Sequence, residues 1–306
     1  MSRITAGFFY FICAIPALAA EIDLFPMADT CLVEYSPTNN MGGEIYFNAG
    51  SNLHGNRNRG LLRFNLSADV PPGSKIQKAI FSIRVVLIPA DEPAASIFDL
   101  HRLLQPWGEG AKLSNTTGPG RGSPATNNEA TWLDRFAFAN SPWFLPGAAP
   151  TNDFVSFKSA EQFISDTGSS PYYFSSVSSP QLAADVQLWL DNPGTNFGWL
   201  LKSRDETTIS TARRFGSRED PNQTPILSVT FVAPPVLEQP QICGNQFQFR
   251  FLADTGQSYV VEFCNSFSPT NSWTTLTNIS PPNASTNILV SDAISSSNRF
   301  YRVIPQ

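Results

Sequence analysis

The sequence predicts an all-β protein with a large antiparallel β-sandwich that includes one short helix, followed by a small second β-sandwich. Three observations favour this fold class. Twenty-five prolines and 19 glycines accompany 12% aromatic residues, a mixture that favours short strands joined by turns. Many segments of strand length alternate apolar and polar residues, and only one segment has a helical pattern. Because helices do not regularly separate the strands, a parallel sheet is not expected.

The chain begins with the pattern of a secretory signal peptide at residues 1–20. Arg3 provides the positive charge, residues 4–18 form an apolar run, and small residues allow cleavage after Ala19 or Ala20. The run is short for a membrane-spanning helix, which needs about 20 apolar residues. We therefore expect a secreted, extracellular or cell-surface protein with no membrane span after cleavage.

Two domains are expected behind the signal peptide. Prolines interrupt strand pairing at residues 234, 235 and 240. We therefore divide the chain into a first domain at 21–232, a linker at 233–240 and a second domain at 241–306.

The first domain contains strand-length segments throughout. They are residues 44–47, 59–66, 76–88, 98–104, 154–157, 198–202, 213–217 and 226–232. In 226–232 the apolar alternate positions are Leu227, Val229 and Phe231, which should face the core. In 59–66, Leu62 and Phe64 should face the core as well.

One helix is expected after residue 179. Ser179 suits the N-cap and Pro180 the first helical position, and Asn192-Pro193 stops the helix. Its apolar face consists of Leu182, Val186 and Trp189. A single helix among strands is best explained as a connection that closes one end of the sandwich.

The second domain shows the same strand pattern. Residues 246–251 alternate apolar and polar, and residues 258–263 do so again after a turn at 254–256. This pattern predicts a hairpin with one buried face. Cys243 and Cys264 flank it, which allows two interpretations in an exported protein: a disulfide, or two small buried thiols. Cys31 would then be unpaired and buried.

The sequence offers little for catalysis. Its only histidines, His54 and His101, lack metal-ligand spacing, and neither a G-x-S-x-G nucleophile elbow nor a P-loop is present. Residues 118–122 are glycine-rich but read as a flexible loop, because no strand–helix context surrounds them. Acidic residues that could pair for hydrolysis occur in any secreted protein. The formal net charge of −5 gives no support to a nucleic-acid partner.

Tryptophans are the main candidates for a sugar platform, because sugar C–H groups pack on aromatic faces. Trp107 and Trp143 lie beside proline or glycine in loops and are the better candidates for exposed rings, with burial in the core as the alternative. Trp189 and Trp199 lie in apolar segments and are assigned to the core.

Several segments of the first domain form a characteristic ordered set. They are Asp29-Thr30, residues 59–67, 101–110, 130–132, 186–193, 196–202 and 215–219. In this order they resemble the DNRLRE domain family, also treated as carbohydrate-binding module family 96, over about residues 22–232. The resemblance implies a jelly-roll β-sandwich on exported proteins, often appended to polysaccharide-degrading enzymes. Some members are linked to acidic polysaccharides such as alginate.

The C-terminal segment resembles a second module. Residues 256–262, Trp273 and residues 299–303 are similar to a fibronectin-III-like module of exported bacterial proteins. This resemblance implies a bacterial origin and a spacer or attachment role, and no activity.

An acidic polysaccharide would require cations on the binding face, and arginine meets a carboxylate with two hydrogen bonds. The candidate ligand-binding cations are Arg63, Lys202, Arg204, Arg213 and Arg214. Alternatively, Arg63 and Arg218 pair internally with Glu219 or Asp29 and organise the fold.

A structural calcium ion is also considered, because β-sandwich modules of this kind often hold one through carboxylates. Asp29, Glu219 and Asp220 are its candidate ligands, and no other cofactor is expected.

These observations predict a secreted, non-catalytic protein whose partner is a polysaccharide. Two alternatives stay open: a structural or adhesive cell-envelope protein that binds another protein, and a polysaccharide lyase or hydrolase.

Overall fold

The computed structural model describes residues 19–114, 118–165, 171–266, 273–294 and 298–306. The predicted signal peptide lies almost wholly outside these residues. Within them, no helix is long and apolar enough to cross a membrane. The chain divides into two compact units, one formed by Glu21–Pro72 with Ile76–Phe231 and the other built around Val232–Gln306.

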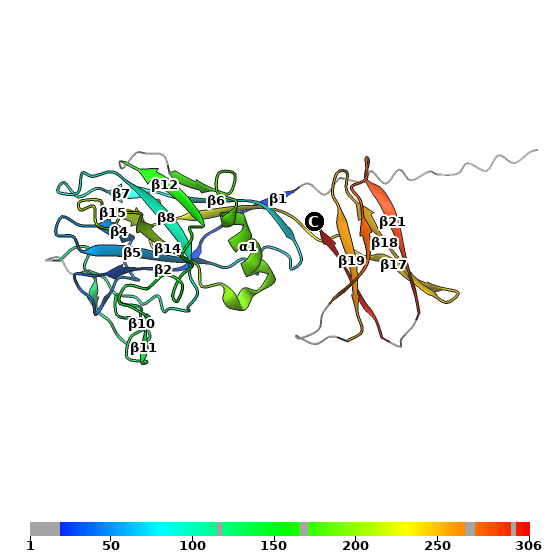
Figure 1. Ribbon diagram of the computed structural model, residues 1–306, viewed down its shortest axis with the longest axis horizontal. Helices are drawn as coiled ribbons and strands as arrows, with labels where there is room; N and C mark the ends of the chain where they lie inside the picture. Colours follow the sequence, from blue (N-terminus) through cyan, green and yellow to red (C-terminus); the bar gives the residue numbers. More distant parts are fainter. Residues whose placement is uncertain (1–18, 115–117, 166–170, 267–272, 295–297) are drawn as a thin grey trace, which may run out of the picture. The chain divides into compact units, whose positions relative to one another are not determined.

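The first unit is a two-sheet sandwich (Figure 1). The smaller sheet has four strands in the order β1 (Ala20–Leu24), β16 (Ile226–Val232), β6 (Lys75–Ile83) and β13 (Tyr172–Ser175). The larger sheet has eight strands. Seven follow in the order β12 (Ala160–Ile164), β8 (Ser96–Arg102), β14 (Trp199–Ser203), β5 (Arg57–Phe64), β4 (Tyr46–Ser51), β15 (Arg213–Gly216) and β7 (Val85–Leu87). The eighth, β2 (Pro26–Val33), pairs with β5 outside this order. The larger sheet is antiparallel, and the predicted all-β sandwich is confirmed.

Two short pairs lie outside these sheets. β3 (Asn39–Asn40) pairs with β9 (Ser123–Pro124), and β10 (Asp134–Phe136) pairs with β11 (Ser141–Pro142).

The main core fills the space between the two sheets. Leu227, Val229 and Phe231 are buried as the alternation predicts. From the larger sheet, Phe64 packs edge-on against Phe81 of the smaller, with ring centroids 5.9 Å apart. Large aromatic rings thus bridge the two sheets, and their buried area supplies much of the stability.

A second core covers the outer face of the larger sheet. It contains Leu61 and Leu200 from the sheet, together with Trp107, Trp132 and Trp143 from the long connection after β8. Trp107 and Trp143, the candidates for an exposed sugar platform, are instead core residues, because their side chains are only 2% and 3% exposed. Their indole N–H groups donate to the carbonyls of Phe197 and Thr131, at 2.8 and 2.9 Å.

The expected helix is present as α1 (Gln181–Asp191). It begins one residue later than predicted: Pro180 is the N-cap, and no side chain caps it. The helix ends at Asn192, and a 3-10 turn, η1 (Pro193–Thr195), follows. The predicted apolar face is confirmed, since Leu182, Val186 and Trp189 are all buried.

A buried carboxylate joins this helix to the larger sheet. Asp185 is 1% exposed and accepts a hydrogen bond from the Trp199 indole N–H at 3.0 Å. Its other partners are the Ser159 hydroxyl, the Gln181 amide and the Arg102 guanidinium, whose Nε lies 3.2 Å from Oδ1. Because the charge is both paired and hydrogen-bonded, its burial is tolerated.

The second unit is a small sandwich of two three-stranded sheets. One contains β17 (Glu238–Cys243), β18 (Gln246–Ala253) and β21 (Thr286–Ala293), and the other contains β20 (Thr274–Ile279), β19 (Tyr259–Cys264) and β22 (Phe300–Pro305). Strand β17 begins inside the predicted linker. Its Pro240 lies on an edge strand beside a register shift, where a missing N–H is tolerated.

The predicted hairpin of the second domain is wrong. Strands β18 and β19 each have one buried face, but they belong to different sheets, so the turn between them crosses from one sheet to the other. The predicted disulfide is wrong for the same reason. Cys243 is exposed, Cys264 is buried, and both are free thiols.

The free cysteines give the first prediction. Cys243 should be the thiol that reacts with an aromatic disulfide reagent in the native protein, since Cys31 and Cys264 are buried. Burial also raises the pKa of the Cys31 thiol to about 12, so it is scarcely ionised at neutral pH. In the protein cleaved after residue 20, which lacks Cys13, we expect one reactive thiol before denaturation and none in Cys243→Ser. A native protein without a reactive thiol would contradict this.

The helix attachment gives the second prediction. Replacing Asp185 with alanine should lower the free energy of unfolding by about 3–5 kcal/mol, because it leaves the buried Arg102 and Trp199 groups unpaired. Asp191→Ala, on the exposed end of the same helix, is the matched control and should change it by less than about 0.5 kcal/mol. Urea titration followed by tryptophan fluorescence measures both. Equal losses in the two variants would contradict the assignment.

Candidate functional site

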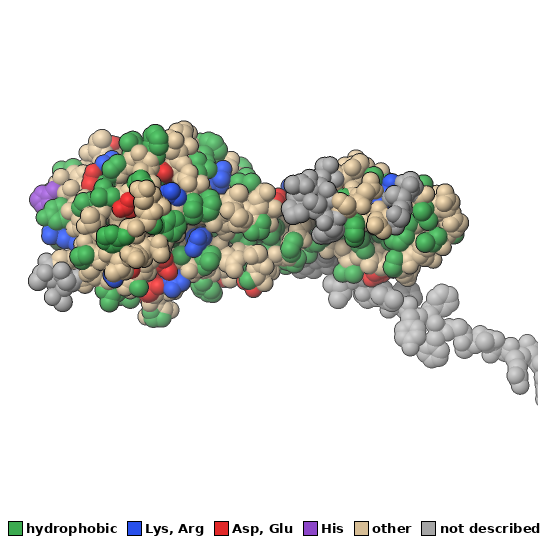
Figure 2. Space-filling model, turned by 90° about the horizontal axis from the view of Figure 1, so that it is seen from below, with side chains coloured by type: hydrophobic (Ala, Val, Ile, Leu, Met, Phe, Trp, Pro, Cys, Tyr) green, Lys and Arg blue, Asp and Glu red, His purple; other side chains and the backbone are tan. Residues whose placement is uncertain are grey.

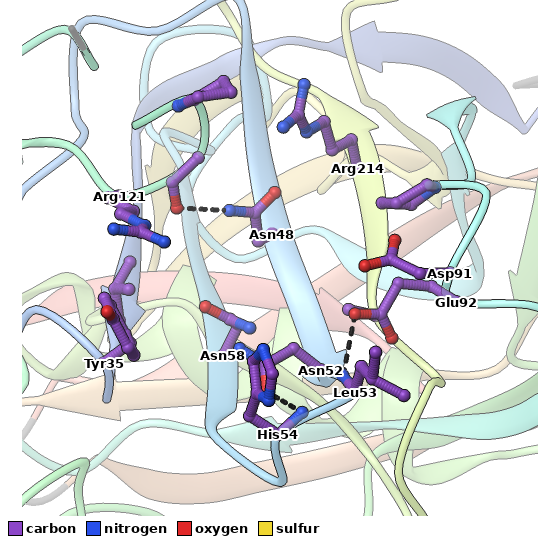
Figure 3. A pocket seen from close by; sticks show the side chains of 15 residues that line it. Tyr35, Asn48, Asn52, Leu53, His54, Asn58, Asp91, Glu92, Arg121 and Arg214 are labelled. Carbon is purple, nitrogen blue, oxygen red and sulfur yellow. Dashed lines mark hydrogen bonds between the residues drawn. The ribbon is translucent and has the colours of Figure 1, made fainter. Parts of the chain in front are cut away.

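A polar cavity of about 280 Å³ lies beside the turn that joins β4 to β5 in the first unit. Seven short stretches of the sequence supply its walls. They contribute Tyr35, Asn48, Asn58, Arg214, the turn at 52–54, the loop at 89–92 and the loop at 119–121. Figure 3 shows Tyr35 and Arg121 on one side, Asp91 and Glu92 on the other, and Asn48 and Asn58 between them.

The glycine-rich loop is fixed against the sheet by side-chain amides. Asn48 donates to the carbonyl of Gly120 at 2.9 Å, and Asn39 donates to that of Arg121 at 3.0 Å. Gly120 has φ +82°, and a Cβ there would lie 3.0 Å from the Asn48 amide nitrogen and 3.3 Å from an Arg214 nitrogen. A glycine therefore lets the loop approach both side chains closely.

Two arginines of this cavity lie over tyrosine rings. The Arg121 guanidinium is 4.3 Å from the centre of the Tyr35 ring, and the Arg214 guanidinium is 4.5 Å from that of Tyr46. Neither arginine forms an ion pair with any carboxylate in the described part of the chain. Stacking holds the planar groups in place and leaves their N–H donors available for an anion.

The opposite wall is acidic and rigid. One oxygen of Glu92 accepts the Leu53 N–H at 2.9 Å, and the other is buried without a partner. Burial raises the pKa of Glu92 above its ordinary value. The Arg213 guanidinium holds this loop by donating to the carbonyls of Glu92 and Ala94, at 2.9 and 2.7 Å.

Of the predicted ligand-binding cations, Arg214 is the one that lines this cavity. Arg213 is 1% exposed and serves the scaffold, so its predicted ligand role is wrong. Lys202 donates to the Ser203 carbonyl at 2.7 Å and pairs with Glu206, and Arg204 pairs with Asp99 at 2.7 Å. On the face in Figure 2, the basic side chains of the first unit are scattered and form no broad patch.

The sequence reasoning missed Tyr35, Asn48, Asn58 and Arg121. The sequence predicts only a flexible loop for residues 118–122, although their glycines let the backbone lie close to neighbouring side chains. The amides form no local sequence pattern, since Asn58 comes to lie opposite Gly50, two residues from Asn48, only after β4 and β5 pair.

The candidate calcium ligands Asp29, Glu219 and Asp220 have other partners: the first two contact Arg218, and the third caps a turn. Asp29 is buried and accepts the Arg218 backbone N–H at 2.7 Å. The Arg218 Nε lies 2.7 Å from Glu219 and 3.0 Å from Glu109, so its predicted pairing with Glu219 is confirmed. Asp220 instead accepts the backbone N–H groups of residues 222 and 223, as a turn cap.

An arginine thus occupies the position between carboxylates where a cation would be expected. Among the described residues, no group of three or more His, Cys, Asp or Glu side chains is placed to hold a metal. The calcium site stays a prediction, tested by melting temperatures with and without a chelator. Arg63, the other arginine considered for internal pairing, forms no ion pair in the described chain and lies 5.5 Å from the Trp107 ring centre.

No family model matches the sequence, and no curated protein is similar to it. The chemistry of the cavity is therefore the evidence on function. It combines two stacked cations, several amides and a half-exposed tyrosine.

The buried carboxylate Asp29 gives the third prediction. Burial raises its pKa well above the ordinary 3.8. The folded state therefore binds the proton more tightly than the unfolded state, so stability from this group is greatest at low pH and falls as pH rises towards neutrality. Asp29→Asn retains an oxygen for the Arg218 N–H. It should gain less stability than the wild type as the pH falls from 7 towards the ordinary carboxyl pKa of 3.8, measured by urea unfolding. Equal changes in both proteins would contradict the expectation.

Proposed function

We propose that this protein is an exported, non-catalytic carbohydrate-binding protein whose first unit binds an acidic polysaccharide in the cavity beside the β4–β5 turn. The observation that carries the proposal is the pair of arginines, Arg121 and Arg214, which are stacked on tyrosines and form no ion pair within the described part of the chain. The resemblance of residues 22–232 to a carbohydrate-binding family supports the same conclusion.

Each part of a uronate chain has a counterpart in this cavity. A guanidinium meets a sugar carboxylate with two parallel hydrogen bonds. The side-chain amides of Asn48, Asn52 and Asn58 offer donors and acceptors for hydroxyl groups. Tyr35 is 51% exposed and offers aromatic surface for sugar C–H groups. Asp91 and Glu92 repel carboxylates on their side, which would orient the chain with its charges towards the arginines.

A second function, adhesion to another protein, is favoured by a different surface. Phe138, Phe144 and Leu145 are 79%, 65% and 56% exposed beside the hairpin of β10 and β11. Exposed aromatic and aliphatic side chains so close in sequence are typical of protein-binding surfaces.

The fourth prediction tests carbohydrate binding. The purified protein should bind uronate polysaccharides more tightly than neutral ones, without releasing unsaturated uronates or new reducing ends. The double variant Arg121→Gln/Arg214→Gln should lose about tenfold or more in affinity for the uronate polymer, as expected when charged hydrogen bonds are removed. Calorimetry and an assay for released sugars measure these quantities.

Lys158→Gln is the matched control, because it removes one positive charge beside β12 at the opposite edge of the larger sheet. It should bind as the wild type does. If no glycan binds, or if both variants lose affinity equally, the proposed site is wrong and adhesion becomes the better candidate. Turnover of the polymer would instead indicate a lyase or hydrolase.

A further inference from the structure

A second pocket lies towards the other end of strand β5. Its volume is about 280 Å³, and it is separate from the first cavity, which shares no lining residue with it. Arg63 of β5, the turn at 65–67, Trp189 of α1 and Asn196 after η1 line it. Asn58 of the first cavity and Arg63 are five residues apart on one extended strand, so about 16 Å separates the two sites along β5.

Three polar atoms of residues in this pocket are buried without a hydrogen-bond partner. They are Nε of Arg63, the indole Nε1 of Trp189 and Oδ1 of Asn196. Trp189 is only 1% exposed. A buried polar group without a partner is costly, and a native protein usually satisfies it with water, an ion or a ligand. Three such atoms around one pocket therefore indicate a polar occupant.

The neighbours of Arg63 and Asn196 fix their orientation. The Arg63 guanidinium lies over the Trp107 ring, 5.5 Å from its centre, and has no carboxylate partner in the described chain. The Asn196 amide nitrogen donates to the Phe64 carbonyl at 2.7 Å. Exchanging its nitrogen and oxygen would place two oxygens together, so Oδ1 is assigned as a free acceptor.

We propose that this pocket binds a small carboxylate that also carries a hydroxyl group, of the kind found in a uronic acid. The two N–H donors, one of them on a cation, suit the carboxylate, and the Asn196 oxygen suits the hydroxyl. Leu66, Met27 and Pro193 provide apolar walls for the carbon skeleton. The proposal does not depend on the function of the first cavity.

Calorimetry of the purified protein with D-glucuronate, glycolate and D-glucose tests it. Glucuronate should bind more tightly than glucose by about tenfold or more, because glucose lacks the carboxylate. Trp189→Phe keeps an aromatic ring but removes the unpartnered N–H, and it should weaken glucuronate binding by about tenfold.

Trp143→Phe is the matched control, since its indole N–H is already bonded to Thr131 and it lies outside the pocket. It should bind glucuronate as the wild type does. Should Trp189→Phe fold poorly, Asn196→Asp provides a second test, because an added negative charge repels the carboxylate and should abolish glucuronate binding.

The source of the carboxylate is settled with an oligouronate titrated into the Arg121→Gln/Arg214→Gln variant. If the oligouronate binds this variant, and adding Trp189→Phe abolishes that binding, the pocket binds the ends of uronate chains. If only free glucuronate binds, the pocket binds the monomeric sugar. Equal affinity for glucuronate and glucose, unchanged binding in Trp189→Phe, or a soaked crystal with ordered water alone in the pocket would each overturn the proposal.

Discussion

Burial of the larger sheet on both faces is the constraint on which the rest of the first unit depends. Adjacent residues of β5, Leu61 and Leu62, point to opposite faces and are both fully buried. One packs into the core between the sheets, and the other packs under the tryptophan layer. Around β5 both faces of the larger sheet are therefore closed to ligands, and the pockets of this unit are lined mainly by loops and residues near strand ends.

The arginines of the first unit perform two different tasks. Some hold the scaffold: Arg59 pairs with Glu206 at 2.6 Å and also donates to the carbonyls of Gly147 and Ala148. Arg121 and Arg214 lie against aromatic rings and form no ion pair with a carboxylate of the described residues. In a chain of net charge −5, such uncompensated cations are local features that the overall charge does not reveal. Arginines without an ion-pair partner have N–H donors available for an anion, whereas arginines such as Arg59 use theirs to hold the scaffold.

Periodicity predicted the parts of the fold that local pattern determines. The buried face of β16 and the apolar face of α1 follow from the spacing of residues such as Leu227 and Val186. Periodicity fails where contacts between segments distant in the sequence determine the structure. Trp107 lies beside proline in an irregular segment, yet that segment folds onto the sheet and buries the ring. Likewise, alternation in β18 and β19 shows which side is buried but not which sheet each strand joins.

The same distinction applies to the candidate sites. Arg214 was recognised from its charge, while Asn48, Asn58 and Tyr35 gain their meaning only when β2, β4 and β5 assemble. The most direct test is an NMR titration with an oligouronate, observing side-chain amide signals. We predict that Asn48, Asn52 and Asn58 shift together and saturate with one affinity. Unchanged signals from these amides, with shifts confined to residues around Phe138, would contradict carbohydrate binding at this cavity.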